Sequence, residues 1–501
     1  MRTDTNDRRR FIEALEAWEW VTGASRPSTG LRVDQAIEEA RHVWQRILDG
    51  ETDSLSAVPS QDLPDVLHGL AAVISEADPR SEAAIDAVVR CFKAVDALVW
   101  PEDHFGEKSG LLSTFSYLVW RQARRTGLEA AREEWERRTV DLALSQPWVR
   151  DFLEIPAQRW SNQLTGCFFQ DPVVVFAYRA RLGVRINLLP VAAWREAIIA
   201  YDWMTQNPTP LLSNDERHYF LASFALTAGA GCKHCGDTNG AIDWLATAER
   251  HALQIIGSGE FRVRITFVRL SVAYERHQYD EVAARLPALL KDAEKVKSPV
   301  FSAKCRLLEA MNFKEMGEWE RAMGAFERLL QSEGARMDPH VRALSKLSLA
   351  GIRSRRRDVE GALALVDDVS GILADSDIPP VRAHAQAVRG EILRDHGVLG
   401  GAIDSYRAAA HDYAQQGMAS MAVYTALIAA ETLLVANREA EAMSQLVALL
   451  PVVDELELVG EGVAIVGLLR EAIRRSKADP ETLRALKSLL SRSEMTQRHD
   501  S

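Results

Sequence analysis

A near-constant period of about 40 residues in the C-terminal half constrains the fold of this chain more than any other feature. At each step a small residue follows a short turn, and the series reads Ala241, Val282, Ala322, Ala362, Ala402 and Ala442, with the first member one residue out of step. Such a period indicates stacked copies of one unit, because a lone helical hairpin cannot bury both of its faces.

The unit itself is read from the stretch Ser302–Leu330, which predicts two short helices joined by a tight turn. Apolar residues at spacings of three to four form one face on each helix. Gly317 stands between them, where a helix ends with a residue that tolerates positive φ. Gly397 and Asn437 suit the same place in later copies, whereas Arg357 makes its copy degenerate.

The order of small, aromatic and glycine residues in this unit resembles the tetratricopeptide-repeat (TPR) family. The residues that carry the resemblance are Ala310, Phe313, Gly317, Trp319 and Ala322, and it covers Ser223 to Leu450. The period departs from the standard repeat of about 34 residues, and in this the chain is similar to the solenoids of bacterial signal-responsive regulators. The resemblance implies a right-handed superhelical all-α solenoid that binds a protein or peptide, and it carries no catalytic residue.

Composition and charge exclude several other classes of protein. The chain has 501 residues, 60 basic against 71 acidic side chains, and a net charge of −11, which argues against direct binding of nucleic acid. It has no apolar run long enough for a membrane span and no secretory signal at its N-terminus. Five cysteines in so long a chain fit a reducing compartment, so we expect a cytoplasmic protein.

Five segments are expected from the pattern along the chain. Residues 1–145 form an N-terminal helical region, in which the two helices on either side of Gly127 resemble a divergent early repeat. Residues 146–208 form an aromatic-rich helical connector. The solenoid follows over 209–476, then a capping helix over 477–492 and a disordered tail over 493–501.

Several polar clusters have both a functional and a structural interpretation. Cys232 and Cys235 could bind zinc with His234 or act as a redox pair, but structural zinc needs about four ligands, so a core thiol is favoured. The acidic surroundings of His104 are better explained by a capped helix start. The arginines of 353–357 and those at 121, 124 and 125 could bind phosphate or an acidic partner, although a solvated face is the favoured interpretation. We therefore expect no catalytic residue, no metal and no cofactor.

The candidate partner-binding residues follow from the position of the first helices, which line the concave wall of such a superhelix. They are Phe267, Tyr274, Leu307, Met311, Lys314, Leu347, Glu391 and Arg394. Simple helix packing is the alternative explanation of the apolar members. The wall lacks the basic clamp with which some TPR proteins hold a peptide carboxylate, so an apolar or amphipathic segment suits it better.

Three functional hypotheses result. The leading one is a scaffold that binds a protein or peptide partner on its concave wall without catalysis. The second is a regulator that senses a peptide or ligand and controls a transcription factor, sigma factor or effector protein. An enzyme using the region Trp100–Glu107 is the third and the least supported. The sequence assigns no oligomeric state.

Overall fold

The computed structural model describes residues 33–455, with gaps at 52–54, 56, 60–61, 77–81, 98–104, 127–128, 147–148, 150–171, 208, 210–211, 297 and 376–377. The described residues contain helices and no strands. They divide into two compact units. Unit 1 comprises residues up to 183 together with 196–225 and 248–262, and unit 2 comprises 184–195, 226–247 and the residues from 263 onward.

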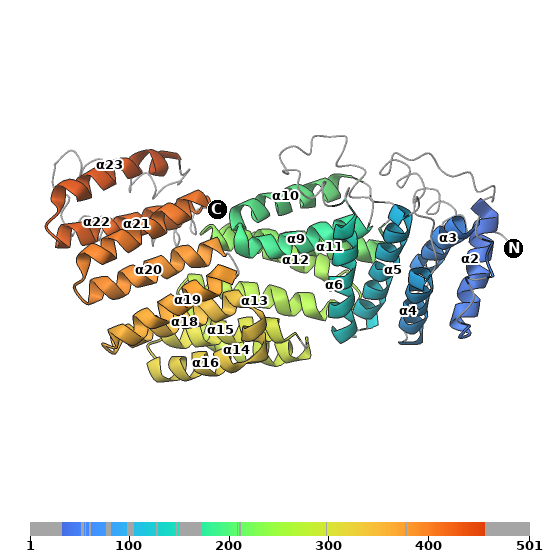
Figure 1. Ribbon diagram of the computed structural model, residues 1–501, viewed down its shortest axis with the longest axis horizontal. Coiled ribbons are helices and arrows are strands. Elements are labelled where there is room, and N and C mark those ends of the chain that lie inside the picture. Colours follow the sequence, from blue (N-terminus) through green and yellow to red (C-terminus); the bar gives the residue numbers. More distant parts are fainter. Residues whose placement is uncertain are drawn as a thin grey trace. The chain divides into compact units, whose positions relative to one another are not determined.

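Unit 1 is built from amphipathic helices near the N-terminus of the described chain (Figure 1). They are α2 (Val33–Leu48), α3 (Leu63–Glu76), α4 (Glu82–Ala97), α5 (Phe105–Thr126) and α6 (Glu129–Ser145). Helix α5 packs against α3, α4 and α6, so its apolar residues from Leu111 to Ala123 are covered on several sides. Gly106 lies in the first turn of this helix.

The next helices each contain residues of both units. They are α9 (Pro172–Leu188), α10 (Pro190–Gln206), α11 (Asn214–His234), α12 (Thr238–Ala252) and α13 (Gly259–Glu275). Helix α9 lies in the stretch 146–208 that the sequence predicts as an aromatic-rich helical connector.

The rest of unit 2 consists of successive helical hairpins (Figure 1). They are α14 (Tyr279–Lys295), α15 (Pro299–Glu315), α16 (Trp319–Gln331), the short α17 (Glu333–Met337), α18 (Pro339–Arg355), α19 (Val359–Asp375), α20 (Pro379–Asp395), α21 (Leu399–Gln415), α22 (Ala419–Val435) and α23 (Glu439–Glu455). Helices α11, α13, α15, α18, α20 and α22 are the first helices of their hairpins. The expected all-α architecture of TPR-like helix pairs is confirmed.

The turn inside each hairpin is the same structure repeated. A residue with positive φ recurs in it with the same period as the small residues, at Gly236, His277, Gly317, Arg357, Gly397 and Asn437. At Gly317 the backbone N–H bonds the carbonyl of Lys314 at 3.1 Å, and the next N–H bonds that of Phe313 at 2.9 Å. These two bonds define a Schellman motif, which satisfies the last carbonyls of the first helix.

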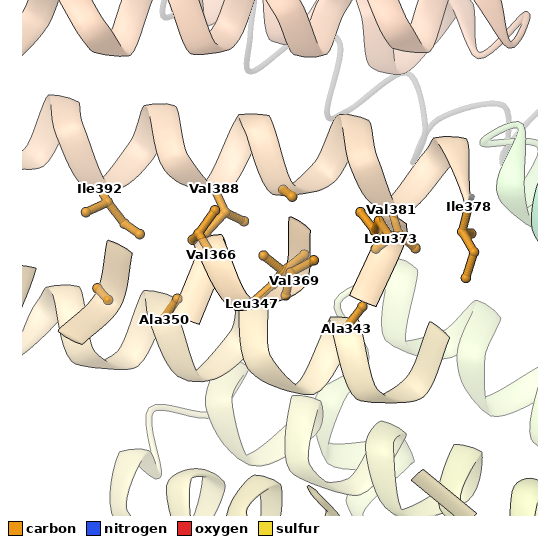
Figure 2. Close-up of a cluster of buried hydrophobic side chains, with 12 residues drawn as sticks. Ala343, Leu347, Ala350, Val366, Val369, Leu373, Ile378, Val381, Val388 and Ile392 are labelled. Atoms are coloured by element: carbon orange, nitrogen blue, oxygen red, sulfur yellow. The ribbon is translucent and has the colours of Figure 1, made fainter. Parts of the chain in front are cut away.

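The period of small residues is explained by the contact between the two helices of a hairpin. All six marker residues, from Ala241 to Ala442, are fully buried. Between hairpins the core continues as layers of branched side chains. Figure 2 shows one such layer, where Leu347 of α18 and Val366 and Val369 of α19 meet Val388 of α20.

The degenerate turn gives a first test of the motif. Arg357 holds φ of 66°, a conformation that costs a residue with a Cβ atom about 1 kcal/mol. We expect Arg357→Gly to stabilise unit 2 by up to about 1 kcal/mol in chemical denaturation, and Gly317→Ala to destabilise it by a similar amount. The two variants should therefore change the free energy of unfolding by similar amounts in opposite directions. A loss of stability in both variants would contradict the shared turn geometry.

Several sequence predictions lie outside the described residues. They include the N-terminal helix near Trp18, the region around His104, the helix Glu461–Ser476, the capping helix over 477–492 and the tail over 493–501. The five-segment division of the chain stays a prediction.

Candidate functional site

Unit 2 contains a cavity of about 500 Å³ that its first helices line. We call it the inner cavity. The first helices contribute Lys233, His234, Tyr274, Glu275, Met311, Pro380, His384 and Met421. Other lining residues come from the start of α10, from the α11–α12 turn with the first residue of α12, and from the end of α21 with the α21–α22 turn: Val191, Trp194, Arg195, Cys235, Gly236, Thr238, Tyr413, Gly417 and Met418.

The start of α10, which contributes to the cavity lining, lies close to two other backbone segments. A Cβ atom on Gly231 of α11 would stand 2.4 Å from Cβ of Trp194, so only glycine permits this approach. Gly417 has φ of 71°, and a Cβ atom there would lie 3.8 Å from the side chain of Val191. The segment that carries Val191 and Trp194 therefore packs closely on both sides.

One part of the cavity lining is apolar and adaptable. Met311, Met418 and Met421 contribute to it, and the ring of Tyr413 packs beside Met418 and Met421 in a small buried cluster. Methionine side chains are unbranched and polarisable, so they adjust to apolar groups of different shapes. This part of the lining suits an apolar side chain of a ligand better than a fixed polar group.

The other part of the lining carries charges and histidines. Nζ of Lys233 lies 3.9 Å from Oε1 of Glu275, which is a loose ion pair. Burial lowers the pKa of His384 to about 4, and the positive charge of Lys314 adds to the effect. Burial also lowers the pKa of His234 well below its usual value, with further contributions from Lys233, His340 and Lys304. Both histidines are therefore neutral at pH 7.

The structure brings two of the predicted partner-binding residues into the inner cavity. Tyr274 and Met311 both line it, and the hydroxyl of Tyr274 donates to Oε1 of Glu315 at 3.4 Å. Lys314 is half-buried, with Nζ 3.1 Å from Oε1 of Glu315. These positions remain a prediction of partner contact.

The remaining predicted residues lie elsewhere. Leu307 and Leu347 are buried in cores between helices, so we assign them to packing, which was the alternative explanation of the apolar ladder. Phe267 meets the ring of Phe301 edge-on at 5.6 Å in another core. Glu391 is exposed, and Arg394 lies over the ring of Tyr406 and pairs with Asp395 at 3.3 Å. None of these five residues lines the inner cavity.

Sequence reasoning missed most of the polar lining, although the period contained a signal for part of it. Lys233, Tyr274 and Lys314 each stand eight residues before a marker residue of the period, so the three occupy equivalent places on successive first helices. His234 was considered only as a zinc ligand. His384 and the methionines at 418 and 421 have no such signal, because they become neighbours only through packing of distant segments.

Both interpretations of the arginine stripe at 121, 124 and 125 were wrong. Arg121 and Arg124 are buried in unit 1 and form ion pairs with Glu216 and Asp215, respectively. The Tyr117 hydroxyl donates to Oε1 of Glu216 at 2.7 Å. Burial by itself raises the pKa of Glu216, but Arg121 and hydrogen bonds from Ser213 and Tyr117 outweigh it and lower that pKa to about 2. The stripe is thus an internal network.

The second arginine cluster lies on the surface as the favoured interpretation predicts. Arg353, Arg355, Arg356 and Arg357 are exposed. Arg355 stacks over the ring of Trp319 at 4.8 Å, and Arg356 pairs with Glu320. These partners lie on the neighbouring hairpin α15–α16, so the cluster supports packing between repeats.

The cysteines are thiols in packed surroundings. Cys232 is buried, as the favoured interpretation of a core thiol predicts, and burial raises its pKa to about 12. Cys235 is half-buried at the cavity, where burial raises its pKa to about 11. In the described part of the chain no group of three or more histidine, cysteine or acidic residues is placed to hold a metal ion.

These helix pairs and their repeated turns define a TPR-like α-solenoid. None of the helices in the described ranges is both long and apolar enough to cross a bilayer. No protein-family model matches the chain, and no curated protein matches it either.

The search of solved structures finds similar helical proteins at low identity. One is a Rap protein complexed with competence and sporulation factor, at 12% identity and a TM-score of 0.42, covering 83% of this chain and 100% of that chain. A second is aspartyl phosphate phosphatase F from Bacillus subtilis, at 13% identity and a TM-score of 0.38, covering 80% of this chain and 96% of that chain. A third is the Cut9–Hcn1 hetero-tetramer of the APC/C, at 10% identity and a TM-score of 0.37, covering 94% of this chain and 95% of that chain. The fold assignment rests on the chain's own hairpins.

Proposed function

We propose that unit 2 binds an apolar segment of a peptide or protein partner in the inner cavity, and that the chain acts as a binding scaffold rather than as a catalyst. The observation that carries this proposal is the cavity itself. Five first helices contribute to its lining, from Lys233 near the end of α11 to Met421 on α22. Residues that lie far apart in the sequence therefore meet around one space.

The size and chemistry of the cavity support this function. Pockets that bind small ligands usually enclose about 300–1,000 Å³ and combine apolar walls with a few polar groups. The inner cavity, at about 500 Å³, falls within that range and has this composition. It accommodates a few side chains, which is the size of a short recognition segment rather than of a broad protein surface.

A variant that fills the cavity tests the proposal. We expect Met311→Trp to abolish capture of partners from a native lysate, because the larger side chain occupies the space that the ligand needs. Met337→Trp is the matched control, since Met337 is 60% exposed and lies outside the cavity. Circular dichroism checks that both variants stay folded. Equal capture by the two variants would place the binding site elsewhere.

The small size of the cavity also favours a second function, a regulator that senses a short peptide. Hydrogen exchange with and without the captured ligand separates the two functions. Protection confined to unit 2 supports the scaffold, whereas changed exchange of unit 1 amides supports the regulator. In the first outcome the ligand only docks, and in the second its binding alters a part of the chain that it does not touch.

A further inference from the structure

The charged groups of the inner cavity leave a small positive excess. Its lining contains Arg195 and Lys233 as cations and Glu275 as the one anion among the lining residues. Two positive charges and one negative charge sum to about +1, in a chain whose net charge is −11. A cavity of this kind attracts one negative charge, because a bound anion replaces the weak attraction of Glu275 for Lys233 at 3.9 Å.

The neutral histidines add donors that can become cations. His234 and His384 line the same cavity. His340 interacts electrostatically with both, and burial together with Lys304 lowers its pKa to about 4. The charged and titratable groups around the three histidines are Arg195, Lys233, Cys235, Asp237, Tyr274, Glu275, Lys304, Lys314, Glu315, Asp338 and Tyr413. Nζ of Lys314 lies 3.1 Å from Oε1 of Glu315. The charges of Lys304 and Asp338 compensate each other, because Nζ of Lys304 lies 3.5 Å from Oδ2 of Asp338.

We infer that the occupant of the inner cavity is a monoanion with an apolar body, and that its binding is coupled to uptake of one proton by His384 or His234. The inference rests on the proposed function and adds the charge of the ligand. The apolar body contacts Met311, Met418 and Met421, and the anionic group faces Lys233 and the two histidines. A segment with one carboxylate, from a side chain or a chain end, has this chemistry.

The coupling of ligand binding to proton uptake follows from the protonation of His384 in the free protein and in the complex. In the free protein the imidazole of His384 is desolvated beside Lys314, so it stays neutral down to about pH 4. An anion placed against it favours the imidazolium and restores the pKa toward its ordinary value of about 6.5. The complex therefore binds more protons than the free protein, and affinity rises as the pH falls from 7.5 to 5.5.

A matched pair of fluorescent probes tests the charge. The anionic probe is 8-anilinonaphthalene-1-sulfonate, and the neutral one is N-phenyl-1-naphthylamine, which has the same rings without the sulfonate. We expect the anion to bind at least about tenfold more tightly to the full chain. Lys233→Met should remove most of this preference, by weakening binding of the anionic probe far more than binding of the neutral one. Equal affinities for the two probes would overturn the inference.

The proton uptake is measured with the same anionic probe, whose sulfonate stays ionised over this pH range. Its Kd should fall about tenfold between pH 7.5 and 5.5, and calorimetry in buffers of different ionisation enthalpy should show about one proton taken up at pH 5.5. The double variant His234→Gln, His384→Gln should lose both effects, and His411→Gln, at an exposed position on α21, should keep them. An affinity that is independent of pH in the unaltered chain would contradict the coupling.

The outcomes also separate this inference from the proposed function. If neither probe binds in a way that Met311→Trp abolishes, the inner cavity is not a binding site and the proposed function fails with it. If both probes bind there with equal affinity at every pH, the cavity binds ligands but the inferred anion and proton coupling are wrong.

Discussion

Replacement of Glu216 by glutamine is expected to destabilise unit 1 by about 3–5 kcal/mol, because it leaves a buried guanidinium without its counter-charge. Nη1 of Arg121 lies 3.2 Å from Oε1 of Glu216, and their side chains are only 2% and 4% exposed. The same carboxylate accepts from Tyr117 and from the backbone N–H of Ser213 at 2.9 Å. Glutamine keeps the shape and the cap of α11 but supplies no negative charge.

An exposed ion pair is the control for this effect. Glu281 and Arg285 on α14 lie 3.0 Å apart and are about half exposed. Pairs of this kind contribute about 0.3–0.5 kcal/mol, so Glu281→Gln should change stability by no more than that. Denaturation by urea, followed by tryptophan fluorescence, measures both variants. A similar small change in the two would mean that Glu216 is not the buried counter-charge of Arg121.

Replacement of Gly334 by alanine is expected to destabilise unit 2 by about 3 kcal/mol through overpacking. Gly334 is buried in α17, and a Cβ atom there would lie 2.0 Å from the carbonyl oxygen of Pro299. Backbone at the start of α15 cannot move aside as a flexible side chain can. The cost is therefore a separation of α17 from α15, which otherwise pack together.

Replacement of Gly371 on α19, in the same unit, is expected to have the opposite effect on stability. It is exposed, and a Cβ atom there would meet nothing within 4 Å. Gly371→Ala should therefore stabilise α19 by about 0.5–1 kcal/mol, since alanine favours helix more than glycine does. Thermal unfolding of the two variants compares them directly. A loss of stability for Gly371→Ala comparable to that of Gly334→Ala would show that helical glycines are costly to replace for a reason other than packing.

The hairpins could be predicted from the sequence because their determinants are local. Each turn needs one residue in the left-handed region after the first helix, and each helix contact needs one small residue soon after the turn. Glycine at 317 and 397 and asparagine at 437 meet the first need, and the alanines one repeat apart meet the second. Arg357 fills the same place without the preferred residue, so only the period revealed its turn.

The inner cavity could be predicted only in part because it depends on packing between distant segments. The equivalence of Tyr274 with Lys233 is visible in the period, but the approach of α10 to Gly231 is not. The prediction for the arginines at 121 and 124 was wrong for a related reason. Their carboxylate partners lie far along the chain on α11, so a run of charges that looks solvated in sequence is buried in the fold.

Methionine methyl NMR tests the inner cavity as the binding site most directly. Of the ten methionines in the chain, Met311, Met418 and Met421 line the cavity, whereas Met337 is exposed on α17. Addition of 8-anilinonaphthalene-1-sulfonate to the full chain with isotope-labelled methionine methyl groups should shift the first three resonances and leave that of Met337 in place. Shifts confined to Met337 or to methionines away from the cavity would contradict the proposed site.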